Sequence, residues 1–340
     1  MNKTGFCLQW HITNRCDQRC KHCYIFSSGK QSPIIEWGIS QATILLDDFL
    51  SFCETYQKVP FVAITGGDPL LHPQFWQIVE LIKKRGIGLS MMGNPFHLTE
   101  NVAKKLFVDY DVIDYQMSLD GLKETHDAIR KPGSFDSTIS KLKEMIEWGY
   151  PTKVMTTVSK SNYAELPELT RLLVNIGVKM VHFARYCPTH GDTDQNIPPD
   201  EYRKLLENMW QVYDELNWSD TIFHLKDHLW QALLYEKGEL KPKNDGIVYG
   251  GCHCGVSHMT ILEDGTVYAC RRMESPIGKV PDQSLSEIFF GKELGKYRQI
   301  EQIDGCKDCV LLHYCRGCRA VAAGSTGNFL SKDPSCWRCR

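Results

Sequence analysis

Short runs rich in β-branched and aromatic residues alternate with amphipathic stretches over about the first 186 residues of the chain. The β-rich runs predict six strands, at residues 6–12, 59–65, 87–91, 112–119, 153–158 and 180–184. The stretches between them predict helices at about 38–56, 73–85, 99–107, 134–148 and 165–175. Buried parallel strands cannot be joined by tight hairpins, so this alternation favours an α/β fold, either a βα barrel or an open parallel sheet. Functional residues are then expected at the carboxyl ends of the strands.

Composition is ordinary for a globular protein except in cysteine, of which the 340 residues carry 15. Lys and Arg number 39 against 41 Asp and Glu, and this balance gives no reason to expect nucleic acid as a partner. The N-terminal stretch lacks the apolar core of a secretory signal, and no run of about 18 apolar residues occurs. We therefore expect a cytoplasmic protein without a membrane segment. Disulfides are rare in a reducing compartment, so closely spaced cysteines are expected to hold metal or to react.

Twelve cysteines fall into three groups, which are Cys16, Cys20 and Cys23; Cys252, Cys254 and Cys270; and Cys306, Cys309, Cys315, Cys318, Cys336 and Cys339. The regular pattern ends near residue 188, where a passage rich in Gly, Asp and Pro precedes expected helices at about 201–216 and 224–236. Beyond residue 241 the periodicity is poor, and a segment so rich in loops and cysteines is expected to be stabilised by metal ligation. The predicted domains are a barrel at 1–187, a helical bridge at 188–245 and a cysteine-rich domain at 246–340.

The first cysteine group has the spacing C-x3-C-x2-C and directly follows a predicted strand. Three thiolates leave one iron of a four-iron cluster open to a substrate or cofactor, whereas a zinc site would need His11 or His22 as a fourth ligand. The loop CDQRCKHCY resembles the cluster loop of the radical S-adenosylmethionine (radical SAM) superfamily, in which an aromatic residue follows the third cysteine. The resemblance implies a partial (β/α)6 TIM-like barrel and an open iron that chelates S-adenosylmethionine. It also implies a flavodoxin- or ferredoxin-type electron donor and cleavage of S-adenosylmethionine to a 5′-deoxyadenosyl radical.

The same resemblance implies a set of residues around S-adenosylmethionine. Tyr24 follows the third cysteine and is expected near the adenine. The second strand ends in a segment that resembles the family's Gly-Gly-Glu-Pro, with Asp in place of Glu: Gly66, Gly67, Asp68 and Pro69. The fourth strand leads to Ser118, Asp120 and Arg130, of which Asp120 has an equally good alternative role as the cap of the next helix. Weaker candidates at the ends of later strands are Thr157, Asn162 and Arg185, the last of which can equally be a solvated surface charge.

The cysteines of the C-terminal part resemble the SPASM extension, with two residues instead of three before Cys318. The resemblance implies a β-hairpin and two auxiliary four-iron clusters, which makes three [4Fe-4S] clusters in all. Its layout assigns Cys252, Cys254, Cys270 and Cys318 to one auxiliary cluster, and Cys306, Cys309, Cys315 and Cys336 to the other. Cys339 is an alternative to Cys336 as the last ligand. Structural zinc knuckles are the alternative interpretation of these cysteine pairs.

Enzymes with this extension act on peptides, proteins and some small molecules. The leading hypothesis is a maturase of a ribosomal precursor peptide that abstracts a side-chain hydrogen and closes a carbon–carbon, ether or thioether crosslink. Only 15 residues precede Cys16, so a separate leader-recognition protein is a possible partner. The alternatives are a peptide epimerase with Cys187 as hydrogen donor, a small-molecule oxidoreductase, and a non-catalytic metal-stabilised binding protein. A sulfatase maturase is disfavoured, because Arg271 stands where that branch has an aspartate after the cysteine.

Overall fold

The computed structural model describes residues 4–26, 33–189 and 191–338, and the chain divides into two compact units. Unit 1 comprises Met1–Met117, Asp136–Lys153 and Cys254–Arg298. Unit 2 comprises Ser118–Phe135, Val154–His253 and Gln299–Arg340. Each unit therefore combines segments that are far apart in the sequence, whereas the sequence pattern divides the chain into three consecutive parts.

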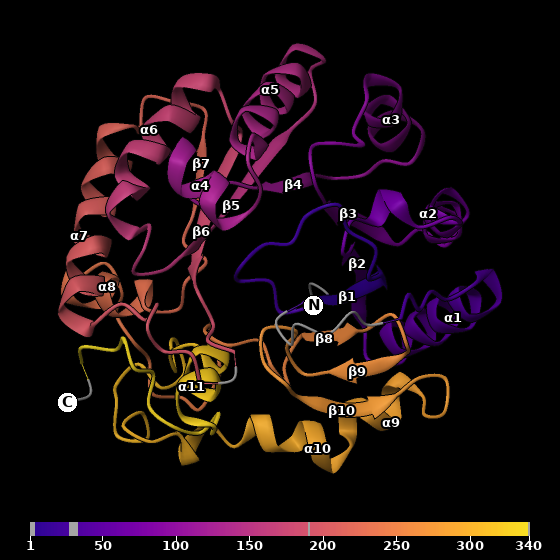
Figure 1. Ribbon diagram of the computed structural model, residues 1–340. Helices are drawn as coiled ribbons and strands as arrows, with labels where there is room; N and C mark the ends of the chain where they lie inside the picture. The colour runs from indigo at the N-terminus through magenta and orange to yellow at the C-terminus, as the bar shows by residue number, and fades with distance from the viewer. Residues whose placement is uncertain (1–3, 27–32, 190, 339–340) are drawn as a thin grey trace. The chain divides into compact units, whose positions relative to one another are not determined.

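Unit 1 is built on a mainly parallel sheet whose strands run in the order β10-β9-β8-β1-β2-β3-β4 (Figure 1). The strands are β1 Thr4–Thr13, β2 Lys58–Gly66, β3 Gly88–Met92, β4 Tyr115–Ser118, β8 His258–Ile261, β9 Thr266–Tyr268 and β10 Pro276–Lys279. β1 pairs in parallel with both β2 and β8, so that Cys7 lies between Phe61 and His258. β9 is antiparallel to its neighbours β8 and β10. The C-terminal hairpin thus extends the sheet that the N-terminal strand begins.

The alternation of side chains along β1 accounts for the core of unit 1. Phe6, Leu8, Trp10 and Ile12 are at most 1% exposed, as period-two patterning of a strand requires. The ring centroids of Phe6 and Phe52 are 4.8 Å apart, and Phe52 belongs to α1 (Ile39–Thr55). The other helices of this unit are α2 Phe75–Lys84, α3 Glu100–Lys104, which continues as a π-helical turn at Lys105–Asp109, α5 Ser134–Glu147, α9 Leu285–Phe290 and α10 Lys292–Gly295.

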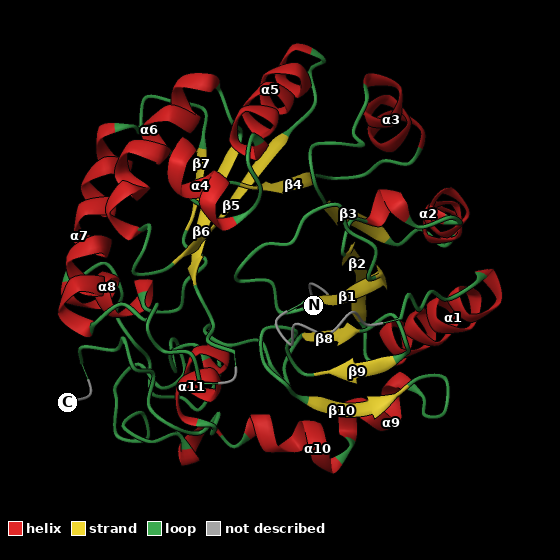
Figure 2. Ribbon diagram, in the orientation of Figure 1, coloured by secondary structure: helices red, strands yellow, loops and turns green. Residues whose placement is uncertain are grey.

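Unit 2 contains the later βα segments and a loop-rich cysteine region. Its strands are β5 Thr152–Val158, β6 Met180–Arg185 and β7 Ile222–His224. β6 and β7 are parallel, with Met180 opposite Ile222. Its helices are α4 Lys123–Ile129, α6 Leu166–Ile176, α7 Pro199–Glu215, α8 Trp230–Glu236 and α11 Arg319–Thr326. In Figure 2 most of residues 299–338 is drawn as loop, with α11 as its longest helix.

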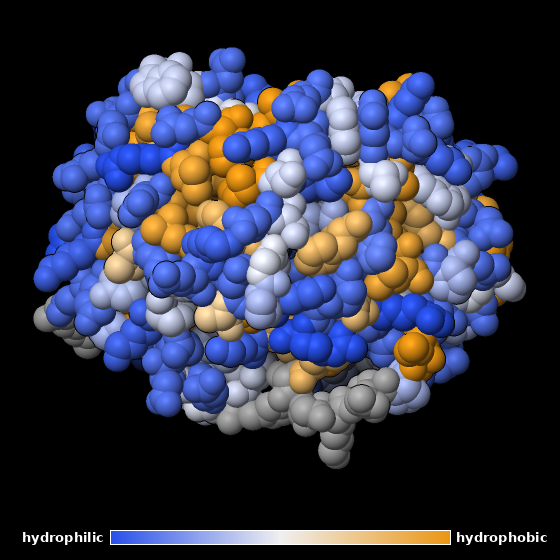
Figure 3. Space-filling model, turned by 45° about the horizontal axis from the view of Figure 1, so that its top comes forward, coloured by the Kyte–Doolittle hydropathy of each residue, from blue (hydrophilic) through white to orange (hydrophobic). Residues whose placement is uncertain are grey.

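On the face drawn in Figure 3, hydrophilic residues predominate and hydrophobic ones gather in separate groups between them. Among the residues that the structure describes, no helix is both long enough and apolar enough to cross a membrane.

The predicted α/β class and parallel strands are confirmed, and each of the six expected strands overlaps one of β1 to β6. One helix prediction is partly wrong. The stretch expected as helix at 224–236 begins inside β7, and its helix starts only at Trp230, because Ile222 to His224 pair with β6. The C-terminal β-hairpin that the resemblance implies is formed by β8 and β9, which pair antiparallel. β10 has no counterpart in the sequence prediction, and it is defined by its pairing with β9.

Candidate functional site

The first cysteine group lies on the loop that follows β1. Cys16, Cys20 and Cys23 are all half-buried and free of disulfides. The loop turns tightly, with the Cys23 amide donating to the Cys20 carbonyl at 3.0 Å. The Gln18 amide lies 3.4 Å from the Cys16 sulfur. Burial raises the pKa of the Cys16 thiol, so a thiolate there needs a cationic partner such as a metal.

The two glycines after β2 bring that strand end against the cysteine loop. The Gly67 amide donates to the Thr13 carbonyl at 2.8 Å, and the Asp68 amide donates to the Arg15 carbonyl at 2.7 Å. A Cβ on Gly66 would collide with the Thr13 carbonyl, and one on Gly67 would collide with the Arg15 carbonyl. The glycines are therefore required by this close backbone approach. Their predicted contact with S-adenosylmethionine stays a prediction.

Asp68 is fully buried and caps the short helical turn at Pro69–Leu71 through the Leu70 amide. Burial raises the pKa of Asp68 to about 6. The Asp68 carboxylate, Asp17 and His97 place one potential ligand atom each within 4.8 Å of one another. The close pair in this group is His97 Nε2 and Asp17 Oδ2, at 3.1 Å.

Asn94, which the sequence analysis missed, follows β3 and supports the cysteine loop. Its amide nitrogen donates to Asp17 at 2.8 Å and lies 3.4 Å from the Cys16 sulfur. Its carbonyl accepts a hydrogen bond from Tyr115 at 2.9 Å. The only sequence signal for Asn94 was its place just beyond a parallel strand, where the loops of neighbouring strands meet.

Four of the residues predicted around S-adenosylmethionine form one network in unit 2. Asp120 is fully buried and binds Arg130 Nε at 2.6 Å through one carboxylate oxygen. The other oxygen accepts from the Thr157 amide at 2.8 Å. The Asn162 side chain donates to the carbonyls of Asp120 and Thr157, both at 2.8 Å. Ser118 is half-buried at the end of β4.

The alternative role of Asp120 as a helix cap is wrong. The N-cap of α4 is Leu122, which has no side-chain cap, and its amide donates to Glu165 instead. Asp120 therefore holds Arg130 and the end of β5 in position. Direct contact of Asp120, Arg130, Thr157 and Asn162 with a cofactor stays a prediction.

The interpretation of Arg185 as a solvated surface charge is wrong. It is 3% exposed and forms ion pairs with Asp227 at 2.9 Å and with Asp333 at 2.6 Å. The two carboxylates hold the pKa of Arg185 well above its usual value, even though burial lowers it. Cys187, two residues further, is half-buried, and its sulfur lies 3.8 Å from the Arg185 carbonyl.

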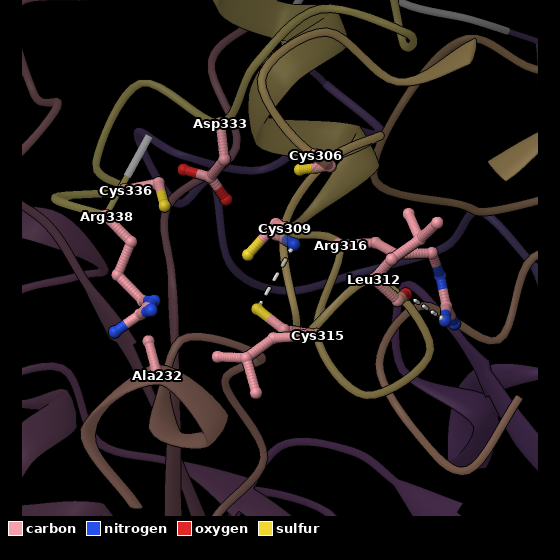
Figure 4. Close-up of a pocket in the computed structure, with 11 residues that line it drawn as sticks. Ala232, Cys306, Cys309, Leu312, Cys315, Arg316, Asp333, Cys336 and Arg338 are labelled. Atoms are coloured by element: carbon pink, nitrogen blue, oxygen red, sulfur yellow. Dashed lines mark hydrogen bonds between the residues drawn. The ribbon is translucent and has the colours of Figure 1, made fainter. Parts of the chain in front are cut away.

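The second predicted auxiliary set lines a single pocket in unit 2 (Figure 4). The sulfurs of its four cysteines point toward a common space: Cys306, Cys309, Cys315 and Cys336. Asp333 lies beside them and accepts from the amides of Cys318 at 2.6 Å and Ser335 at 3.0 Å. Four convergent sulfur donors fit a metal site that prefers thiolate, so the residues present fit an iron–sulfur cluster. Cys339 lies outside the described residues.

The first predicted auxiliary set is divided between the two units. Cys254 and Cys270 belong to unit 1, whereas Cys252 and Cys318 belong to unit 2. In unit 2, burial lowers the pKa of His228, but a hydrogen bond with Cys252 raises it above its usual value. Arg316 donates to the carbonyls of Gly250 at 2.6 Å and Cys252 at 3.0 Å. Common ligation by this set stays a prediction.

Two family models match the chain. One, described as the radical SAM superfamily, covers residues 10–173, and the other, the SPASM iron–sulfur cluster-binding domain, covers residues 252–310. Among curated proteins, an AdoMet-dependent heme synthase of Methanosarcina barkeri is 27% identical over 97% of this chain and 95% of its own length. The mycofactocin maturase MftC of Mycobacterium tuberculosis is 29% identical over 97% of this chain and 82% of its own.

Solved structures match in fold. Streptococcus suis SuiB bound to S-adenosylmethionine has a TM-score of 0.76 and 17% identity, with 98% of this chain and 78% of SuiB covered. A second SuiB structure holds the precursor peptide SuiA. The structure of anSMEcpe with bound AdoMet has a TM-score of 0.75 and 19% identity, with 97% of this chain and 93% of that one covered.

Proposed function

This chain is a radical SAM enzyme with a SPASM iron–sulfur domain, and from that premise we propose that it matures a ribosomal precursor peptide by an oxidative crosslink. The observation that carries the proposal is the similarity to a mycofactocin maturase over 97% of the chain. The fold shared with SuiB, one structure of which holds a precursor peptide, agrees with a peptide substrate. The bond formed is a carbon–carbon, ether or thioether link from an unactivated side-chain position.

Three [4Fe-4S] clusters are proposed, in addition to S-adenosylmethionine. Cys16, Cys20 and Cys23 would hold the cluster with an open iron, and the two C-terminal sets would hold the auxiliary clusters. When bound, these groups supply the electron that cleaves S-adenosylmethionine and a place for the electron that an oxidative crosslink releases. Fully ligated auxiliary clusters thus have a use beyond stabilising their loops.

The described side chains prepare the site for this chemistry. Asn94 and Asp17 fix the cysteine loop, because their hydrogen bond joins the loops after β1 and β3. The glycine pair keeps the end of β2 in backbone contact with the same loop. In unit 2, Asp120 orients the Arg130 guanidinium, which we propose contacts the ribose hydroxyls or the methionine carboxylate of S-adenosylmethionine.

The proposal is tested first on the cofactors. Anaerobic purification and reconstitution should give about twelve irons and twelve sulfides per chain. Dithionite and S-adenosylmethionine should then yield 5′-deoxyadenosine, and replacing Cys16, Cys20 and Cys23 together by Ala should abolish it. A zinc-loaded, colourless protein that cleaves no S-adenosylmethionine would support the non-catalytic binding protein instead.

The substrate is tested with the peptide encoded by a short open reading frame beside the gene. A crosslinked product is two hydrogens lighter, and tandem mass spectrometry locates the bond. A peptide of unchanged mass that contains a D-residue would favour the epimerase. In that case Cys187→Ala should still form 5′-deoxyadenosine but should no longer produce the D-residue.

A second candidate function rests on the heme synthase relatives, one of which aligns with 95% of its length. On this hypothesis the substrate is a tetrapyrrole, and the enzyme is the small-molecule oxidoreductase named above as an alternative. Iron coproporphyrin III incubated with the reduced enzyme and S-adenosylmethionine should then change its mass and absorption spectrum. An unaltered tetrapyrrole beside a modified peptide would exclude this function.

A further inference from the structure

The guanidinium group of Arg271 lies against aromatic rings, and its buried Nε has no acceptor among the residues that the structure describes. It directly follows Cys270, just beyond β9 in unit 1. Its Cζ lies 4.5 Å from the ring centroid of Tyr24 and 5.9 Å from that of Tyr268. Within the described residues, the cation–π contacts of this guanidinium are with these two rings, and no carboxylate lies within ion-pair distance of it.

Two further polar side chains, Glu263 and His11, lie near Arg271, and neither forms an ion pair with it. Glu263 is close enough for the positive charge of Arg271 to oppose the burial that raises the pKa of this carboxyl, yet no ion pair joins the two side chains. His11 is fully buried, and its Nδ1 also lacks a partner. Burial, then the charges of Arg271 and His258, lower the pKa of His11, so its ring is neutral. The positive charges of Arg271 and of the neighbouring Arg272 both act on Tyr24. Within the described residues, Arg271 Nε and His11 Nδ1 are buried and have no hydrogen-bond partner.

A half-buried guanidinium without an anion is costly, and stacking on aromatic faces leaves its edge free for a planar partner. A carboxylate matches that edge with two parallel hydrogen bonds. A phosphate would call for several free cationic or amide donors around it, and the neighbouring Arg272 already takes part in an interaction of its own. A peptide carries its negative charge as carboxylate, at the C-terminus or on Asp and Glu.

We propose that Arg271 binds a carboxylate group of the peptide substrate and so selects an acidic or C-terminal position for modification. This inference rests on the proposed function, because it names the substrate group that the same site takes. It also gives a chemical reason for the departure from sulfatase maturases. Where those enzymes carry an aspartate after the cysteine, this chain presents the opposite charge and attracts an anion.

The test uses the reactivity of arginine toward phenylglyoxal in the reconstituted wild-type enzyme under anaerobic conditions. N-acetylglycine, a mimic of a peptide C-terminus, should slow modification of Arg271 several-fold, as measured by peptide mass spectrometry. N-acetylglycinamide, which lacks the charge, should not. Arg171, which is paired with Glu215 at 2.7 Å, serves as the internal reference and should react equally in both arms.

Equal reactivity of Arg271 with the acid and the amide would overturn the proposal. Protection by S-adenosylmethionine alone would overturn it too, because the bound anion would then be the cofactor's carboxylate. Saturation-transfer NMR gives an independent readout: the N-acetylglycine signal should be lost in Arg271→Gln and kept in Lys58→Gln, a matched loss of one positive charge at the start of β2. Neither measurement needs turnover, so they stand even if no crosslinked peptide is found.

Discussion

At the scale of single residues, several buried charged side chains in this protein are paired with partners of opposite charge. Arg185 is the clearest case, since its guanidinium spans Asp227 and Asp333, and both carboxylates are at most 4% exposed. Asp333 also receives the amides of Cys318 and Ser335. The end of β6 is thereby linked through one guanidinium to the loops that carry the C-terminal cysteines. Arg185 acts on the cysteine pocket through Asp333, which makes it a positioning residue.

Removing this guanidinium should be severely destabilising. Arg185→Gln leaves two carboxylates buried without their countercharge, and we expect the free energy of unfolding to fall by about 3–5 kcal/mol. Urea denaturation followed by circular dichroism, at equal iron content, measures the loss. Arg171→Gln breaks a solvent-exposed ion pair and should leave the midpoint almost unchanged. Equal midpoints for the two variants would show that the buried pairs do not hold unit 2 together.

At the scale of elements, the strand ends converge on the cysteine loop through backbone contacts more than through side chains. β1 leads into the loop, the end of β2 touches it through Gly67 and Asp68, and the segment after β3 reaches it through Asn94. Each contact joins residues 50 to 80 positions apart, so none follows from local sequence. The order of the parallel strands is what brings them together.

Because the end of β2 lies against the cysteine loop, adding one methyl group at Gly67 should lower both stability and iron binding. Gly67→Ala would place Cβ against the Arg15 carbonyl and beside Cys16. We expect a loss of about 1–3 kcal/mol in stability and a drop in iron bound by the first cysteine group. Gly5→Ala is the control, since nothing lies within 4 Å of its added Cβ. Iron analysis and 5′-deoxyadenosine yield measure the effect, and normal values in Gly67→Ala would contradict it.

At the scale of the whole molecule, the hydrophobic core is distributed unevenly along the chain. Unit 1 carries an aromatic core in which Phe6, Phe52 and Phe289 meet at centroid distances of 4.8–5.5 Å. Residues 299–338 have far less regular structure and a small cluster around Ile303, Cys306 and Leu312. A region with so little core is expected to depend on its bound cluster.

Iron removal should therefore act unevenly along the chain. After chelation under reducing conditions, we expect hydrogen exchange to rise strongly in residues 299–338 and little in β1 and β2. Mass spectrometry of peptic fragments, with and without reconstitution, measures both regions in one sample. A uniform rise along the chain, or protection retained at 299–338 without iron, would show that these loops are stable without a cluster.

The sequence by itself determined the α/β class and the six strands, and its cysteine motifs carry the resemblance to the radical SAM and SPASM families. Hydrophobic period and motif spacing are local properties, so they can be recognised without the fold. Cys306, Cys309, Cys315 and Cys336, which the resemblance to the SPASM extension assigns to one cluster, line one pocket. Their common ligation of a cluster stays a prediction. The surroundings of charged side chains needed the tertiary structure. The position of Arg185 at the end of a strand suggests either a surface charge or a cofactor contact. In the structure it is buried and paired with Asp227 and with Asp333, which is 148 residues away in the sequence. Likewise, the sequence marks Arg271 only as a replacement of the aspartate found in sulfatase maturases. Its stacking on Tyr24, a residue near the other end of the chain, follows only from the fold. Burial and pairing depend on partners that chain folding brings from afar, which is why only the three-dimensional arrangement decides them.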